Sequence, residues 1–293
     1  MKYYKTRICS SCLKELFYSC RASYWLANKN NARCRSCATT DYDNRKNNVE
    51  ILLNENLESY YWLGFILADG HISKDYRLVV TLSNKDKLHL LKLANYINTI
   101  VRSTKNDTHC TIATMNKKSN LLLCNKFDIN NNKTYNPPKL EIFNNLNREQ
   151  LISVFAGFID GDGSIKNLHK RKDFALHIKC HSSWINILKI FSNNFLKDCS
   201  VIINNAGYSL LTCGNSIILK DLKRELLKLN LPLMNRKWDK INLDFISRQE
   251  LSKDRVEIIK ERLLQKTKHK DIAAELGITR SGLFGLIKRN KLK

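Results

Sequence analysis

The sequence lacks any apolar run long enough to span a bilayer, so it does not predict an integral membrane protein. Its first residues, MKYYK, also lack the apolar core of a secretory signal peptide. We therefore expect a cytosol-like compartment, such as a bacterial or phage-infected cytoplasm or an organelle matrix. In such a compartment the ten cysteines would be reduced.

Acidic residues are in short supply, because 27 Asp and Glu stand against 50 Lys and Arg, a formal net charge of +23. An excess of positive charge this large favours a polyanionic partner such as nucleic acid. The length of the chain allows two or three domains with cores of their own.

Two segments of the chain end in the same pattern: residues 61–70 read YWLGFILADG and residues 154–163 read VFAGFIDGDG. Each is an apolar helix pattern with two small residues four apart, a spacing that shares one helix face and allows two backbones to approach closely. A glycine in a helix costs about 1 kcal/mol relative to alanine, so these residues require a packing reason. The small residues are Gly64, Ala68, Gly157 and Gly161.

Both helix patterns stop at an aspartate followed by glycine, Asp69 before Gly70 and Asp162 before Gly163. We expect the two glycines to take the left-handed conformation that often ends a helix. If the helices pack face to face, the carboxylates emerge side by side at two negative helix-dipole ends and need a cation. Carboxylates suit Mg²⁺, and a carboxylate pair with metal suits phosphodiester hydrolysis. The plainer alternative is that each aspartate only caps a turn.

Both segments resemble the closing positions of the LAGLIDADG motif of homing endonucleases. The second copy is nearly complete, whereas Leu67 of the first stands where the motif usually has an acid. The resemblance covers about residues 50–250 and implies a double-motif, single-chain endonuclease that cuts both DNA strands and leaves short 3′ overhangs. It also implies that Asp69 and Asp162 bind the catalytic Mg²⁺.

A similar order of elements follows each motif. After the first we expect a strand over 77–82, a helix over 85–97, strands near 100–103 and 110–115, and a helix near 118–127. After the second we expect a strand over 174–181, a helix over 184–196, strands over 201–204 and 208–213, and a helix over 217–229. The expected fold is α+β, with two pseudo-symmetric αββαββα half-domains, residues 50–147 and 148–248. Their antiparallel sheets would form a DNA-binding saddle.

The polar faces of these strands would enter the major groove of DNA and contact base edges. Our candidates are Arg77, His177 and Lys179, although they would equally suit the solvated face of a half-buried sheet. The family resemblance further implies a basic residue that reaches the active site from each half, to position water or stabilise phosphate charge. Lys237 matches best, and Lys133 takes the corresponding place in the first half; the alternative is that both are surface lysines.

A separate N-terminal module, residues 1–45, is indicated by two Cys-x2-Cys pairs, Cys9 with Cys12 and Cys34 with Cys37. Paired thiolates at this spacing suit a tetrahedral Zn²⁺, and a module this small needs metal for stability. It resembles the small zinc modules of phage-type nucleases. Whether Cys20 replaces one ligand is left open by the spacing, and four buried thiols without metal are the alternative.

Residues 254–293 are expected to form three helices, after a charged linker at 250–255. Residues 270–289 resemble a helix-turn-helix, with Gly277 in the turn and a recognition helix over about 280–289. A tail of this kind also occurs as a mere packing domain. The candidates for base edges are Arg280 and Ser281, and those for phosphates are Lys288 and Arg289.

These observations predict a monomeric, site-specific double-strand DNA endonuclease of homing type, acting on a long asymmetric target with Mg²⁺ for catalysis and Zn²⁺ for structure. No intein splice-junction pattern is present. One alternative is a DNA-binding regulator with a LAGLIDADG-like domain, although such regulators tend to lack the acids present here. The other is an RNA maturase that assists intron splicing, which would bind RNA by shape and 2′-hydroxyl groups.

Overall fold

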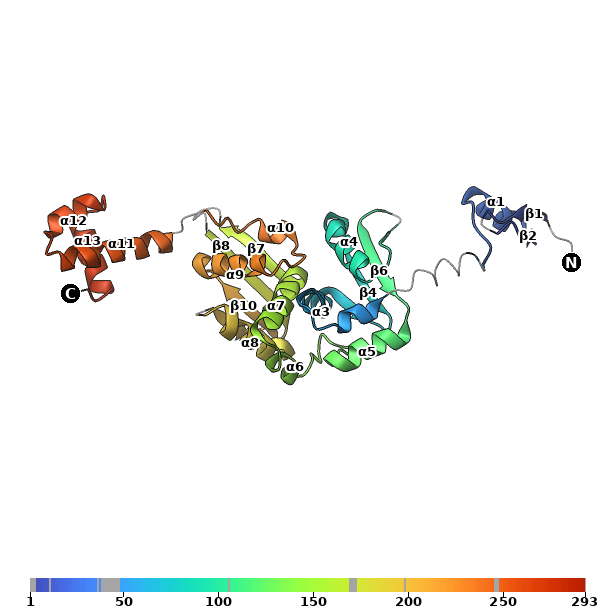
Figure 1. Ribbon diagram of the computed structural model, residues 1–293, viewed down its shortest axis with the longest axis horizontal. Coiled ribbons are helices and arrows are strands. Elements are labelled where there is room, and N and C mark those ends of the chain that lie inside the picture. Colours follow the sequence, from blue (N-terminus) through green and yellow to red (C-terminus); the bar gives the residue numbers. More distant parts are fainter. Residues whose placement is uncertain are drawn as a thin grey trace. The chain divides into compact units, whose positions relative to one another are not determined.

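The computed structural model describes residues 4–10, 12–35, 37, 48–104, 106–168, 173–197, 199–244 and 248–292 (Figure 1). The chain divides into two compact units, one of residues 1–53 and 73–123 and the other of residues 54–72 and 124–293. The first motif helix, α3 (Leu57–Asp69), belongs to the second unit, together with the second motif helix, α7 (Arg148–Asp162). The predicted α+β fold with antiparallel sheets is confirmed.

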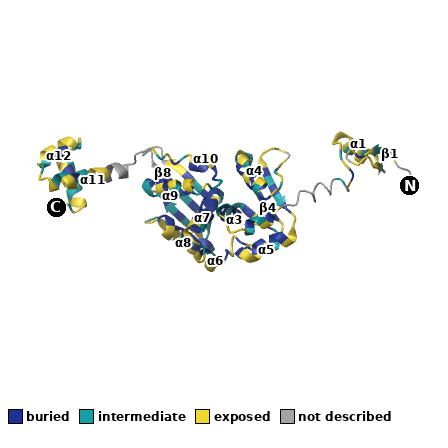
Figure 2. Ribbon diagram, in the orientation of Figure 1, coloured by how far each residue is buried: buried dark blue, intermediate teal, exposed yellow. Residues whose placement is uncertain are grey.

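Helices α3 and α7 lie side by side in the second unit (Figure 1). Most of each helix is buried on all sides, as Figure 2 shows, and such all-round apolar helices belong in a core. Asn56 begins α3 by accepting a hydrogen bond from the Ser59 N–H, and Asn147 and Gln150 form a capping box at the start of α7. Both helix starts are therefore fixed by local side chains.

The two helices approach so closely that glycine is required at two equivalent places. A Cβ atom on Gly64 would collide with the backbone carbonyl oxygen of Val154, and one on Gly157 would collide with that of Tyr61. A Cβ atom on Gly161 would collide with the side chain of Ala68. The helix contact that the matched small residues predict is thus confirmed, and it is pseudo-symmetric.

The expected left-handed helix ends at Gly70 and Gly163 are wrong. Their φ and ψ angles are −74° and 147° for Gly70 and −75° and 150° for Gly163, which is extended backbone. They begin strands β3 (Gly70–Ile72) and β7 (Gly163–Leu168). Glycine is needed for space instead, since a Cβ atom would lie 2.5 Å from a carbonyl oxygen of the preceding turn.

The second unit contains a four-stranded antiparallel sheet in the order β7-β8-β10-β9. Its strands after β7 are β8 (Asp173–His181), β9 (Ser200–Ile203) and β10 (Tyr208–Cys213). On β8, Phe174, Leu176 and Ile178 are buried, whereas His177 is half-buried and Lys179 is exposed, so the predicted alternation is confirmed. One face of the sheet therefore belongs to the core. The other face is open and carries His177 and Lys179 beside the apolar residues Leu210 and Ile202. The helices of this unit that begin between residues 124 and 244 are α6 (Leu140–Asn144), α7, η3 (Ser182–Trp184), α8 (Ile185–Phe195), α9 (Ser216–Lys228) and α10 (Asn235–Trp238).

The first unit contains the sheet order β4-β6-β5. Leu78, Val80 and Leu82 of β4 are buried, as predicted. On the opposite face Thr81 and Thr111 join their hydroxyl groups across the two strands at 2.8 Å. The elements are η1 (Val49–Leu53), β4 (Leu78–Ser83), η2 (Asn84–Asp86), α4 (Lys87–Tyr96), β5 (Arg102–Ser103), β6 (His109–Thr114) and the start of α5 (Lys117–Phe127).

The chain also forms a small segment at each end. The N-terminal segment contains β1 (Lys5–Ile8), β2 (Glu15–Tyr18) and α1 (Arg21–Lys29). The C-terminal segment contains α11 (Arg248–Leu264), α12 (His269–Glu275) and α13 (Arg280–Arg289), so the segment expected as a linker at 250–255 is helical and belongs to α11. No helix in the described part of the chain has the length and apolar character that a membrane crossing requires.

Candidate active site

The two motif aspartates stand at the C-terminal ends of α3 and α7. Oδ2 of Asp69 lies 3.4 Å from where a Cβ atom on Gly161 would be, so this carboxylate is beside the end of α7. Both carboxylates attract the same two ammonium groups, those of Lys133 and Lys237. The end of the α3–α7 pair thus gathers one carboxylate from each motif with two cations.

The two lysines hold equivalent positions under the helix ends. Lys133 Nζ donates to the carbonyl oxygens of Leu67 and Ala68 at 2.7 and 3.0 Å. Lys237 Nζ donates to three carbonyl oxygens at the end of α7, the shortest bond being 2.6 Å to that of Asp160. The carbonyl groups in the last turn of a helix carry the negative end of its dipole, and here that of Ile159 also accepts from the Gly163 N–H. Only 8% of the surface of Lys133 and 7% of that of Lys237 is exposed, so neither residue is the surface lysine of the alternative interpretation.

Burial and neighbouring charges shift the pKa values of Lys133, Lys237 and Asp162 in opposite directions. Burial lowers the pKa of Lys133 and Lys237, and the nearby aspartates oppose this shift. Desolvation raises the pKa of Asp162, and the two ammonium groups oppose that shift. Partly desolvated groups that hold each other charged are typical of functional sites. The all-oxygen carboxylate pair, open to water, fits Mg²⁺ by the chemistry of its donors.

Asp160 is a residue of this site that the sequence reasoning missed. Its carboxylate is buried, at 1% exposed, and accepts three hydrogen bonds: from Tyr61 Oη at 2.6 Å, the Met234 N–H at 2.9 Å and Trp238 Nε1 at 2.8 Å. Burial raises the pKa of Asp160 to about 6, although these donors and Lys237 favour the ionised form.

The bonds of Asp160 tie α7 to α3, which carries Tyr61, and to α10, which carries Lys237. Asp160 therefore positions Lys237 under the helix end. The sequence does carry one signal for the role of Asp160, an acidic residue within an apolar helix at the position where the first motif has Leu67.

A cavity of about 680 Å³ lies beside Asp162. Its walls come from the end of α3, residues 133–135, the end of β8 with η3, and the turn at 206–208. Besides Asp162, its lining includes Lys133, Lys179 and His181. Of the predicted DNA contacts, Lys179 thus lines a cavity next to an acid of the candidate site.

The other two predicted DNA contacts on the sheets differ in their surroundings. His177 is half-buried on the open face of β8, with Nδ1 3.5 Å from Thr212 Oγ1. Its pKa is lowered by burial and by the charge of Lys166. Arg77 is exposed and lies one residue before β4, in the first unit. Arg102 on β5, opposite Thr111 on β6, is also exposed, and the sequence did not point to it as a DNA contact.

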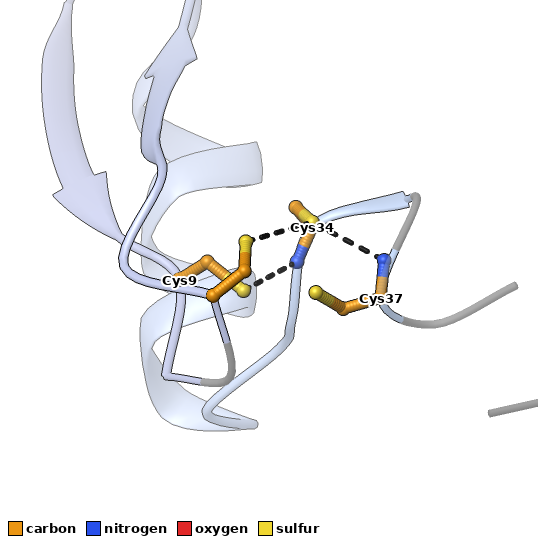
Figure 3. Close-up of side chains that lie close together, drawn as sticks. Cys9, Cys34 and Cys37 are labelled. Carbon is orange, nitrogen blue, oxygen red and sulfur yellow. Dashed lines mark hydrogen bonds between the residues drawn. The ribbon is translucent and has the colours of Figure 1, made fainter. Parts of the chain in front are cut away.

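The four N-terminal cysteines lie together, with all Sγ atoms within 4.8 Å of one another. Figure 3 labels three of them, Cys9, Cys34 and Cys37. The Sγ atoms of Cys12 and Cys34 are 3.7 Å apart, close to the edge of about 3.8 Å that Zn–S bonds of about 2.3 Å give a tetrahedron. The backbone N–H groups of Cys34 and Cys37 donate to sulfur at 3.2 and 3.3 Å. The cluster fits Zn²⁺.

The cysteines of the cluster differ in their pKa values. Hydrogen bonds with the thiols of Cys12 and Cys34 raise the pKa of Cys37 to about 12, whereas the backbone N–H of Cys37 lowers the pKa of Cys34. Binding of a metal by all four cysteines would therefore release a proton from Cys37. Cys20 lies outside the cluster and donates to Ser23 Oγ at 3.1 Å, so the set of four is complete without it.

The C-terminal helices pack around Ile259, Ile272, Ala273 and Leu283. Gly277, with φ of 57°, makes the left-handed turn after α12, and Thr279 caps α13 by accepting from the Gly282 N–H. The predicted contact residues are all exposed on α13 and remain predictions. They are Arg280 and Ser281 at its start and Lys288 and Arg289 at its end.

No protein-family model matches the chain, and no curated protein matches it either. Many solved structures are similar to it. Three of them are the LAGLIDADG homing endonuclease I-GzeII in complex with a DNA target (13% identity, 71% of this chain and 91% of that chain, TM-score 0.39), I-LtrWI bound to target DNA (14%, 84% and 99%, 0.40), and I-SmaMI bound to an uncleaved DNA target with calcium ions (12%, 78% and 96%, 0.40). At these identities and TM-scores the likeness carries no functional argument, which rests on the site itself.

Proposed function

We propose that this protein is a site-specific double-strand DNA endonuclease of the LAGLIDADG homing type, which hydrolyses phosphodiesters with a divalent metal held by Asp69 and Asp162. The observation that carries the proposal is the matched pair of helix ends. Each of α3 and α7 ends in an aspartate, each end is held by a buried lysine, and the two helices meet through glycine.

The residues of the site have separable tasks in this reaction. Asp69 and Asp162 would hold Mg²⁺, which when bound activates water and stabilises the leaving oxygen. Lys133 and Lys237 fix the helix ends that carry these aspartates, and their charge compensates that of the carboxylates. The same two ammonium groups favour the approach of an anionic phosphate to an acidic site.

The rest of the chain supports DNA as the substrate. The net charge of +23 favours a polyanion, and each unit has a sheet with one open face that carries polar residues. Because both acids belong to one chain and the two halves differ in sequence, the enzyme would act as a monomer on an asymmetric target. The zinc-binding module and the C-terminal helices would extend the contact with DNA on either side of the cleaved site.

Substituting each acid separately tests the assignment. We expect Asp69→Asn and Asp162→Asn to slow double-strand cleavage by about 100-fold or more while DNA binding persists, since a metal ligand is removed without a change of shape. Asp239→Asn, an exposed carboxylate in the segment after α10, is the matched control and should cleave normally. Unchanged cleavage in both active-site variants would refute the assignment.

The two alternatives give different outcomes in the same experiment. A regulator would bind duplex DNA with no metal-dependent breaks in the parent protein. A maturase would prefer structured intron RNA over duplex DNA.

A further inference from the structure

The cavity beside Asp162 holds two hydrogen-bond donors that the catalytic assignment does not use, Lys179 and His181. They are two residues apart on β8, so their side chains lie on the same face of the strand. Lys179 Nζ lies 4.0 Å from the centroid of the Tyr208 ring, which steadies the ammonium group by a cation–π contact. Lys179 thus brings a positive charge to the same cavity as Asp162.

The ring of His181 is held in one orientation and one tautomer. The backbone N–H of Ser183 donates to Nδ1 at 3.3 Å, and because this donor cannot rotate away, Nδ1 is the acceptor and Nε2 carries the proton. Ser183 Oγ lies 3.0 Å from Nδ1, and the ring packs edge-on against Tyr135 with centroids 4.8 Å apart. In the part of the chain that the structure describes, Nε2 has no hydrogen-bond partner.

This arrangement is absent from the equivalent strand of the first half. His181 pairs with Tyr208 at the end of β8, as Ser83 pairs with His109 at the end of β4. Two residues earlier, Lys179 corresponds to Thr81 by the same register. The first half therefore has two short hydroxyl side chains where the second has a cation and an imidazole.

We infer that Lys179 and His181 form a phosphate-binding subsite, which takes one backbone phosphate of the DNA next to the acid of the second half. A phosphate oxygen accepts hydrogen bonds from both an ammonium group and a neutral N–H. The substrate in this inference rests on the proposed endonuclease function. Because a lysine and a histidine occupy these two strand positions in the second half, and short hydroxyl side chains occupy them in the first, the subsite serves one of the two DNA strands.

The test separates the roles of the two nitrogen atoms of the His181 ring. In His181→Asn the side-chain oxygen still accepts from the Ser183 N–H, since asparagine is a good capping residue. The donor at the Nε2 position is removed, because the asparagine NH₂ group takes the place of Cδ2 and ends one bond short of Nε2. The matched control is Ser83→Asn at the equivalent first-half position. The substrate is a duplex that the parent protein cleaves, or one selected for binding to it. For each protein, binding is measured in EDTA, and the cleavage rate of each end-labelled strand is measured in Mg²⁺.

A neutral methylphosphonate is then placed in turn at each phosphate near the break. We expect His181→Asn to weaken binding by about tenfold, the size of a hydrogen bond to a charged group, and to slow one strand more than the other. At one position the methylphosphonate should weaken binding of the parent protein and leave that of His181→Asn unchanged. Ser83→Asn should show neither effect.

Two results would overturn the inference. Equal effects of His181→Asn and Ser83→Asn would refute a special role for His181. If, at every position, the methylphosphonate weakened the binding of His181→Asn as much as it weakens that of the parent protein, a phosphate contact of His181 would be refuted. Either result leaves the endonuclease proposal standing if Mg²⁺-dependent breaks occur. If the parent protein binds DNA without cutting it, the binding data alone decide whether the phosphate-binding subsite exists. If it binds no duplex, both proposals fail.

Discussion

At the scale of residues, the candidate site depends on charged groups removed from water and held by specific partners. Asp160 is the clearest case, because a carboxylate has only acceptors and here faces three donors. Burying a carboxylate without such donors would be prohibitive, which explains why an acid is tolerated in the middle of an apolar helix. The same reasoning applies to the buried lysines, whose donors meet only carbonyl oxygens.

Replacing Asp160 by Asn should destabilise the fold. The amide has one acceptor oxygen, and its NH₂ group would face at least one of the three donors, so a buried donor is left without a partner. We expect the free energy of unfolding to fall by about 2 kcal/mol, measured by chemical denaturation. The exposed Asp239→Asn should change it little, and equal decreases in the two variants would show that the three bonds do not matter.

At the scale of elements, the α3–α7 pair is the feature on which the site depends, since it carries both aspartates. Glycine is required where the backbones nearly touch. Gly64→Ala and Gly157→Ala should each destabilise the protein by about 2 kcal/mol, because the added Cβ atom meets a backbone carbonyl that cannot move aside.

The same substitution at Gly214 serves as the control for the helix contact, since a Cβ atom there meets nothing within 4 Å. The temperature of thermal unfolding and the rate of Mg²⁺-dependent cleavage should both fall for the α3–α7 variants and stay unchanged for Gly214→Ala. Equal behaviour of the three variants would contradict the close packing.

Much of this architecture could be predicted from the chain. Alternating apolar residues located β4 and β8, and the repeated small residues located the helix contact, because both signals are local in sequence. The conformation of Gly70 could not be predicted from the sequence. Glycine is required there because a Cβ atom would collide with a carbonyl oxygen of the preceding turn, and not because φ is positive. Asp160 was missed because its donors come from α3 and from residues 234–238, far away in sequence.

At the scale of the whole molecule, the N-terminal segment should depend on metal in a way that the rest does not. Its helix α1 has no fully buried residue, so metal ligation must supply most of its stability. Chelation should remove about one Zn²⁺ per chain and make residues near α1 sensitive to protease, while the other parts keep their secondary structure. Cys34→Ser should behave like the chelated protein and Cys20→Ser like the parent; an N-terminal segment indifferent to chelation would contradict a zinc centre.

The C-terminal helices should add to DNA affinity through charge. Replacing Lys288 and Arg289 by Ala should weaken binding on every sequence and reduce the slope of log affinity against log salt by about 0.9 for each phosphate that the protein no longer neutralises. Arg280→Ala should instead relax the sequence preference if Arg280 contacts a base edge. Salt-independent effects would show that the tail only packs.

The central claim is that two aspartates on paired helices cut DNA with a divalent metal. The most direct measurement incubates the full protein with a library of long duplexes, with Mg²⁺ or with EDTA, and sequences the resulting ends. The account predicts discrete breaks that require Mg²⁺, carry short 3′ overhangs and vanish in Asp69→Asn and Asp162→Asn. Duplexes that are bound and enriched but never broken with Mg²⁺ would contradict it.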